Sequence, residues 1–177
     1  ETLAAIGAVR STRLLRWVGK LVSFIYNRCT IILGQSKGFL SSIGRYCSDQ
    51  NKILYFPSWS EDVFSQTSTD KATEVPTSTE TFNILFAGNV GTAQDLPAVL
   101  DAATELKDNP AIRWLIVGDG RMSDWLSAEV ASRGLQQNVL LLGRYPVERM
   151  PSFYAHADAL LVSLKKDPVF SLTIPGK

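Results

Sequence analysis

Four short apolar runs, each separated from the next by a helical pattern, constrain the fold of this sequence more than any other feature. The runs cover residues 83–88, 112–117, 138–142 and 158–163, and the helical patterns cover 94–107, 121–133 and 147–156. Strands and helices that alternate in this rhythm predict βαβ units, in which right-handed crossovers bring parallel strands into one sheet. We therefore expect the second half of the chain to be an α/β domain.

The first part of the chain predicts an incomplete domain of the same class. It contains a helix over 9–27, a strand over 30–34, a helix over 36–47 with Ser36 as its N-cap, and a strand over 52–57 that Pro57 ends. Residues 59–81 are rich in Ser, Thr and acids and have almost no periodic apolar positions, so we interpret them as a linker. The expected organisation is a partial domain over 1–58, this linker, and a second partial domain over 82–177. A helix without a preceding strand and a last strand without a crossover partner suggest a fragment.

Composition excludes several other classes of protein. The 177 residues are 45% hydrophobic and 20% charged, which is typical of a globular protein. Cys29 and Cys47 have no metal-ligand spacing, and we expect them to be reduced, cytosolic thiols. The sequence has no run of about 18 uncharged apolar residues and its first residues do not resemble a signal peptide, so we expect a chain that neither spans a membrane nor is exported.

Glycine and polar residues gather where the predicted strands end. Gly88, Asn89 and Gly91 follow the first run; Gly118, Asp119 and Gly120 the second; Gly143, Arg144 and Tyr145 the third; and residues 163–173 the fourth. In an open parallel sheet, ligands bind outside these strand ends. Glycine lets backbone N–H groups approach a phosphate, which the following helix attracts with its positive end. Each glycine could instead only close a tight turn, but four such strand ends favour a phosphate ligand. The first loop lacks the GxGxxG pattern of dehydrogenases, which argues against a nicotinamide cofactor.

These segments also resemble a known family. The ordered set ILFAGNVGTAQDL, WLIVGDG, NVLLLGRYPVERMPSFYAHADALLVSL and DPVFSLTIPGK is similar to the donor-binding domain of family-4 glycosyltransferases with the GT-B fold. Within that family the similarity is greatest to bacterial enzymes of O-antigen and colanic-acid assembly, such as N-acetylfucosaminyl transferases. The upstream segment NKILYFPSWSEDVF resembles the exit from the family's first domain. The resemblance implies two Rossmann-like domains, of which this chain holds the end of the acceptor-side domain and the start of the donor-side domain.

The resemblance also implies a function. A family member of this kind moves a sugar, with retention of configuration, from a nucleotide-sugar donor, here expected to be UDP-linked, to a saccharide on a polyprenyl diphosphate. Such an enzyme of bacterial surface-polysaccharide synthesis would be cytoplasmic and peripheral on the inner face of the plasma membrane. It would need no nucleic acid, metal or cofactor, and the fragment alone is expected to be inactive. The alternatives are a GT-B nucleotide-sugar 2-epimerase and a non-catalytic module that binds nucleotide and docks on membranes.

Individual site residues follow from the same resemblance. It places the nucleotide and its diphosphate on Gly88, Asn89, Gly91, Gln94, Gly143, Arg144, Tyr145 and Pro146, and the donor sugar and phosphate on Asp167, Phe170, Ser171, Leu172, Thr173 and Lys177. Many members have Arg and Lys where this chain has Asn89 and Gln94, so backbone dipoles and cations such as Arg144 or Lys177 would have to meet the phosphate charge. The paired glutamates of the family are not seen in their usual spacing. We therefore assign no catalytic residue and no metal ligand. The single histidine, His156, precedes a strand and is more typical of packing than of catalysis.

Basic residues concentrate at the start of the chain. Residues 1–57 contain eight Lys or Arg and two acids, whereas residues 58–177 contain ten and fifteen. On a helical wheel, Arg10, Arg13, Arg16 and Lys20 share one arc, Leu14, Leu15, Val18, Leu21, Val22 and Ile25 lie opposite, and Trp17 and Phe24 fall at the basic edge. This distribution is typical of a helix on an anionic membrane surface, with Arg10, Arg13, Arg16, Trp17 and Lys20 as contacts. An ordinary surface helix that packs its apolar side on the rest of the first domain is the alternative.

Overall fold

The computed structural model describes residues 11–59, 62–64 and 70–175, which divide into two compact units. The first unit runs to Trp59 and also includes the segment that starts at Lys165. The second unit ends at Leu164. The segment after Lys165, which the sequence analysis groups with 82–177, thus lies in the first unit, while the boundaries of the two expected domains stay a prediction.

The first unit is a small α/β assembly. It contains α2 (Thr12–Arg28), β1 (Ile32–Gly34), α3 (Lys37–Gly44), a 3-10 turn η1 (Gln50–Lys52), β2 (Ile53–Tyr55) and a second 3-10 turn η4 (Phe170–Leu172). Strands β1 and β2 are parallel, with Ile32 opposite Ile53. Ser36 caps α3 as predicted, because its Oγ accepts a hydrogen bond from the Phe39 amide at 3.2 Å.

Turn η4 packs against α3 within this unit. The Ser36 hydroxyl donates to the carbonyl of Leu172. Leu172 lies so close to Gly38 that a Cβ built there would be 3.1 Å from its side chain. The segment around η4, at the end of the described chain, therefore packs against α3, which lies near the start of the chain.

The second unit contains the predicted parallel sheet. Its elements are a 3-10 turn η2 (Asp62–Phe64), β3 (Phe82–Ala87), α4 (Leu96–Glu105), β4 (Ile112–Val117), α5 (Ser123–Ser132), β5 (Val139–Gly143), a 3-10 turn η3 (Val147–Arg149), α6 (Met150–Tyr154) and β6 (Ala159–Leu160). The strand order is β5-β4-β3-β6, with every pair parallel. The α/β class and the parallel sheet are confirmed. The fourth strand is shorter than the predicted 158–163, because its pairing with β3 covers only two residues.

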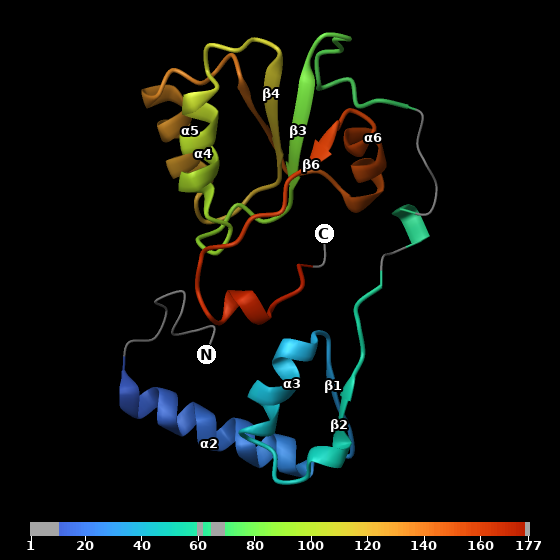
Figure 1. Cartoon of the computed structure of the whole chain (residues 1–177), viewed down its shortest axis with the longest axis vertical. Coiled ribbons are helices and arrows are strands. Elements are labelled where there is room, and N and C mark those ends of the chain that lie inside the picture. The colour runs from blue at the N-terminus through green and yellow to red at the C-terminus, as the bar shows by residue number, and fades with distance from the viewer. Residues whose placement is uncertain (1–10, 60–61, 65–69, 176–177) are drawn as a thin grey trace. The chain divides into compact units, whose positions relative to one another are not determined.

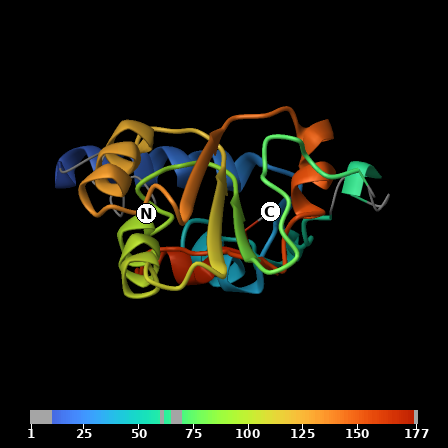
Figure 2. The ribbon, with the colours of Figure 1, turned by 90° about the horizontal axis from the view of Figure 1, so that it is seen from above.

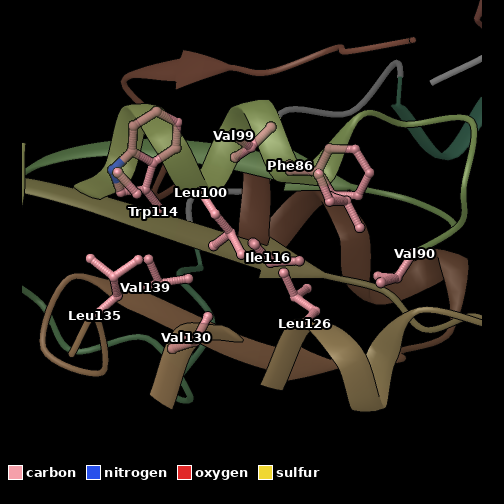
Figure 3. Packing of buried hydrophobic residues seen from close by; sticks show 12 residues of the cluster. Phe86, Val90, Val99, Leu100, Trp114, Ile116, Leu126, Val130, Leu135 and Val139 are labelled. Atoms are coloured by element: carbon pink, nitrogen blue, oxygen red, sulfur yellow. The ribbon is translucent and has the colours of Figure 1, made fainter. Parts of the chain in front are cut away.

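Helices cover both faces of this sheet. Helices α4 and α5 lie on one side of β3 and β4, and α6 lies on the other, as both views show (Figures 1 and 2). The alternation of side chains along the strands explains the two layers. Phe86 and Ile116 point to α4 and α5, where they meet Leu100 and Leu126 (Figure 3). The preceding residue of β4, Leu115, belongs to the core on the other side.

Part of the segment interpreted as a linker is packed on the second unit. Ala72 and Val75 are 3% and 2% exposed and join the core on the α6 side of the sheet. The amide of Ala72 donates to the carbonyl of Ser152, and its own carbonyl lies 2.8 Å from His156 Nε2. His156 is thus a packing residue, as expected. The stretch interpreted as a linker thus contains two buried apolar side chains that no periodic pattern marks, while its role as a linker stays a prediction.

No helix in the described part of the chain is both long and apolar enough to cross a membrane.

Candidate functional site

The carboxyl ends of β3, β4 and β5 meet at one edge of the second unit's sheet. Ala87 pairs with Val117, and Val117 pairs with Gly143, past an irregularity in β4 between Ile116 and Val117. Because the strands are parallel, the residues that follow them emerge side by side. This register brings together the glycine-rich and polar loops that the sequence places at three separate strand ends.

A pocket of about 370 Å³ lies at this edge. Its lining consists of Gly88, Asn89, Val117, Gly118, Asp119, Arg144, Tyr145 and Met150. A second, adjoining hollow of about 630 Å³ is lined by Arg144, Tyr145, Pro146, Val147 and Met150. The first volume lies within the range of small-molecule sites, and Arg144 and Tyr145 face both spaces. The strand ends therefore form a hollow of suitable size, with one cation and one aromatic ring at its side.

Two glycines let the loops approach one another closely. A Cβ on Gly118 would lie 1.8 Å from the carbonyl oxygen of Gly88, and the φ of Gly118 is +145°, which side-chain-bearing residues rarely adopt. A Cβ on Gly120 would lie 2.4 Å from the carbonyl oxygen of Val90. The second loop thus lies directly against the first, and the pocket opens where they diverge.

Hydrogen bonds between these loops use several of the backbone donors that the sequence analysis assigns to a phosphate. The Gly88 amide donates to Val117 at 2.8 Å, and the Val90 amide donates to Asp119 at 2.9 Å. The amides of Asn89 and Thr92 have no acceptor among the described residues. The loop therefore presents fewer backbone donors than its glycine content suggests.

Asp119 adds a negative charge to the rim of the pocket. Its Oδ1 accepts hydrogen bonds from the Ser123 hydroxyl at 2.6 Å and from the Gly120 amide at 2.7 Å. The bond from Ser123, then that from Gly120, and the nearby charge of Arg144 hold the pKa of Asp119 below its ordinary value. An ionised carboxylate repels phosphate and accepts hydrogen bonds from sugar hydroxyls. The rim thus offers a site for hydroxyl groups beside the cation Arg144.

Tyr145 is held in place by its neighbours. Its ring centroid lies 4.6 Å from that of Phe153, and the guanidinium of Arg149 lies 5.5 Å from the Tyr145 ring. Arg149 is paired in turn with Glu74 at 2.9 Å, from the stretch interpreted as linker. A backbone hydrogen bond, followed by the bond and charge of Arg149, lowers the pKa of Glu74 against a raising effect of desolvation. Glu74 and Arg149 therefore support one wall of the pocket from outside it.

Only part of the predicted nucleotide set lines the main pocket. Gly88, Asn89, Arg144 and Tyr145 do so, and Pro146 lines the adjoining hollow. Gly143 ends β5, and its carbonyl accepts a bond from the Gly118 amide. Gly91 and Gln94 lie farther along the first loop, where Gln94 Oε1 is buried without a hydrogen-bond partner among the described residues. The carbonyl of Gln94 accepts from the Ser163 hydroxyl at 2.7 Å, which ties this loop to the chain beyond β6.

Sequence reasoning did not assign Val117 or Met150 to the pocket. Val117 is the last residue of a mostly apolar strand, which is typical of a protein core. Met150 begins a helix that follows the Arg144 loop. The glycines of the sequence predicted the loops of the pocket but not the apolar side chains that line it. Asp119 was noted at a strand end but not assigned to the site, because Asp beside Gly is typical of a simple turn.

Helix α4, which follows the first loop, begins unusually. Its N-cap residue, Asp95, has a φ of +50°, and its side chain forms no capping hydrogen bond. Asp95 is the one described residue other than glycine with a positive φ. A carboxylate beside a helix N-terminus takes the place in which an anionic ligand would gain from the helix dipole. The positive end of α4 is thus partly neutralised by the chain itself.

The described residues that are predicted to contact the donor sugar lie in the first unit. Asp167 Oδ1 accepts a bond from the Val169 amide at 2.8 Å, and Phe170 is 8% exposed. Ser171 is exposed, and the carbonyl of Leu172 accepts the Ser36 bond. Thr173 follows η4, and Lys177 lies outside the described residues. Their role toward a sugar stays a prediction.

The described residues that are predicted to contact a membrane lie on α2. Arg13, Arg16, Trp17 and Lys20 are all exposed, and Arg10 lies outside the described residues. Among the described residues, no group of three or more His, Cys, Asp or Glu side chains could hold a metal ion.

The sequence around the pocket matches a known family. Residues 68–173 match the family described as glycosyl transferases group 1. The match spans more than half of the chain and includes the sheet and pocket of the second unit. The chain belongs to this family.

A relative with detectable sequence identity agrees with membership in this family. The chain is 30% identical over 121 residues to a protein of Escherichia coli strain K12 described as a colanic acid biosynthesis glycosyl transferase, WcaI. The matched stretch covers 64% of this chain and 29% of WcaI. This glycosyl transferase group 1 chain therefore spans less than a third of that relative.

Solved structures show the fold. Anabaena Alr3699/HepE, in complex with UDP and glucose, matches with a TM-score of 0.64 at 12% identity, over 82% of this chain and 41% of that one. A glycosyltransferase from Rickettsia africae ESF-5 matches with a TM-score of 0.64 at 16% identity, over 81% of this chain and 41% of that one. At such identities the likeness shows the fold alone, which is the Rossmann-like architecture of GT-B glycosyltransferases.

Proposed function

We propose that this glycosyl transferase group 1 chain forms part of an enzyme that takes a sugar from a UDP-linked donor. The observation that carries the proposal is the pocket where three strand ends converge, with Arg144 and Tyr145 at its side. Complexes of the fold relative HepE with UDP and glucose and with UDP-glucose support the choice of donor.

The proposed nucleotide site lies in the second unit. In the second unit, the loop from Gly88 to Gln94 meets the diphosphate and the loop from Gly143 to Pro146 meets the base. Asp119 suits a ribose hydroxyl, because its carboxylate is held ionised beside the pocket. A role toward the donor sugar and phosphate for Asp167, Phe170, Ser171, Leu172, Thr173 and Lys177 is a separate part of the proposal, which rests on the family resemblance.

The proposed chemistry is electrostatic. Retaining transfer separates the sugar from a nucleoside diphosphate, whose growing negative charge must be stabilised as the glycosidic bond breaks. Asn89 and Gln94 carry no charge and cannot supply a cation to the diphosphate. Arg144 and the unpaired amides of the first loop are suited to that task instead. The proposal includes no metal and no resident cofactor, and it assigns no catalytic acid or base.

We further propose that the acceptor is a lipid-linked saccharide, a sugar on a polyprenyl diphosphate, in bacterial surface-polysaccharide synthesis. The similarity to WcaI supports this acceptor class, and kinship to N-acetylfucosaminyl transferases belongs to the same proposal. The enzyme would then work on the cytoplasmic side of the plasma membrane as a peripheral protein. Because the chain spans 41% of its structural relatives, we expect it to transfer no sugar alone and to bind nucleotide weakly.

Ligand-observed NMR, which detects weak binding, tests the donor site. UDP should give saturation transfer from the chain, and Arg144→Gln should weaken UDP binding about tenfold, the usual size of one lost bond to a charged group. Arg121→Gln is the matched control, because Arg121 is exposed and close in sequence to Asp119 but does not line the pocket. Equal weakening by both variants, or no UDP signal from the folded chain, would contradict the proposed site.

A further inference from the structure

Helix α2 uses one face to join the first unit. Leu15, Val18 and Val22 are half-buried on that face. The Ser23 hydroxyl donates to the carbonyl of Tyr46 at 2.9 Å, and Figure 1 shows α3 and both strands on this side of the helix. The apolar arc that the sequence analysis treats as one surface is therefore divided, since Leu14, Leu21 and Ile25 are 48%, 43% and 48% exposed.

The opposite side of α2 carries a line of alternating cations and aromatic rings. Its members are Arg13, Trp17, Lys20, Phe24 and Arg28, spaced three or four residues apart and all exposed. Residues at this spacing share one side of a helix. We call this line the outer stripe of α2.

The two aromatic rings of the outer stripe are the most exposed side chains of the helix's apolar residues. Trp17 is 64% exposed and Phe24 is 57% exposed. The guanidinium of Arg28 lies 4.0 Å from the centre of the Phe24 ring, which places a positive charge directly over the aromatic face. Leu14, Leu21 and Ile25 flank the stripe on one side and Arg16 on the other.

The charges of α2 have one sign. The helix contains four cations and no acid. None of these cations forms an ion pair with another described residue. Against a protein surface, cations are almost never fully buried unless they are paired. At a bilayer surface the cations meet lipid phosphates while Trp and Phe enter the boundary between head groups and acyl chains.

We propose that the outer stripe of α2 binds the surface of an anionic bilayer, with Trp17 and Phe24 inserted at the interface and Arg13, Lys20 and Arg28 on head-group phosphates. The binding surface differs from the one expected from the sequence, because Phe24 and Arg28 join it and the exposed Leu21 supports the inserted rings. It belongs to the first unit and does not depend on the pocket of the second. Loss of membrane binding and loss of nucleotide binding are therefore separable.

Vesicle co-sedimentation of the 177-residue chain tests the charge contribution. Binding to vesicles of phosphatidylcholine with about a third phosphatidylglycerol should exceed binding to phosphatidylcholine alone and should fall as salt rises. Each cation near such a surface contributes about fivefold, so Arg13→Gln with Lys20→Gln should weaken binding about 25-fold. Lys71→Gln with Lys107→Gln is the charge-matched control, because both lysines are exposed in the other unit. Equal loss in both double variants would show a net-charge effect and overturn the proposal.

Quenching by lipids brominated on their acyl chains tests insertion of the aromatic ring. The chain has four tryptophans, and only Trp17 lies on the outer stripe, so Trp17→Phe should abolish most of the quenching while leaving co-sedimentation nearly unchanged. Unchanged quenching in Trp17→Phe would show that another tryptophan meets the bilayer and would refute insertion of the outer stripe. No binding of the parent chain to anionic vesicles would refute membrane binding altogether. The UDP signal of each variant should match that of the parent, which reports on the folded second unit.

Discussion

A single backbone position, Gly118, sets the distance between the two loops that form the pocket. A Cβ there would lie 1.8 Å from the Gly88 carbonyl oxygen, in a backbone conformation that other residues rarely adopt. Because Gly88 is bonded to Val117 on one side, it cannot move away without breaking the end of the sheet. The site and the stability of the second unit therefore depend on the same residue.

We predict that Gly118→Ala lowers the free energy of unfolding by about 3 kcal/mol, from backbone strain and overpacking together, and abolishes the UDP signal. Gly134→Ala is the matched control: its φ is +69°, and nothing lies within 4 Å of the new Cβ. It should cost only about 1 kcal/mol, the usual penalty of a left-handed conformation, and leave UDP binding intact. Urea unfolding and NMR measure the two effects, and similar costs in both variants would argue against the close loop contact.

At the scale of elements, residues 70–81 form a strap on the second unit that two buried side chains, Ala72 and Val75, anchor. Val75 fills the core on the α6 side of the sheet, and Glu74 pairs with the arginine that lies over Tyr145. The strap thus combines packing of the sheet with support for the pocket wall.

We predict that Val75→Ala lowers the free energy of unfolding by about 2 kcal/mol, because it leaves a cavity at a 2% exposed site. Val162→Ala removes the same two methyl groups from a side chain that is 51% exposed and should cost less than about 0.5 kcal/mol. Thermal or urea unfolding compares the two. A small effect of Val75→Ala would mean that the strap does not contribute to the core.

The sheet was predictable from sequence, and the strap was not, for physical reasons. Strands such as β4 consist mostly of β-branched and large apolar residues between turn signals, with Arg113 as the one charged residue of β4, so their identity and parallel pairing follow from local pattern. Ala72 and Val75 are two apolar residues in a polar stretch, and their burial depends on a groove that distant residues create. The local pattern of apolar residues therefore cannot predict their burial.

The pocket was predictable to a similar extent. Two lining residues, Gly88 and Arg144, could be predicted because glycine and charged residues at the ends of parallel strands are typical of ligand sites. Met150 did not, because a methionine in a short helix is typical of core packing. The register of the strands decides which loop amides form hydrogen bonds within the protein, as the Gly88 amide does with Val117. The sequence alone does not give this register.

At the scale of the whole molecule, the first unit is built from two separated parts of the chain. The chain leaves it after Trp59 and returns at Lys165. The returning segment contributes the buried Phe170 and the Leu172 carbonyl that Ser36 engages. The stability of α3 therefore depends on residues more than 130 positions away, as the Ser36 to Leu172 separation of 136 shows.

We predict that residues 1–64 and 70–177, expressed as two separate chains in one cell, co-purify as a complex. Gly38→Val should weaken the complex, because its Cβ would press on Leu172 at 3.1 Å. Ser41→Val, at an exposed position of the same helix, is the control and should leave the complex intact. Size-exclusion chromatography of the tagged pair reports the outcome, and independent elution of the two parent pieces would show that the returning segment contributes little.

The discontinuous first unit has a consequence for recombination between related enzymes. A chimera that exchanges this unit at one junction, after Trp59, would pair a foreign α3 with the original returning segment and place a mismatched side chain against Gly38. Two junctions, one after Trp59 and one after Leu164, would keep α3 and η4 together. Inheritance of the first unit as a functional module therefore requires a double crossover, so the segment from Lys165 onward must diverge in step with α3.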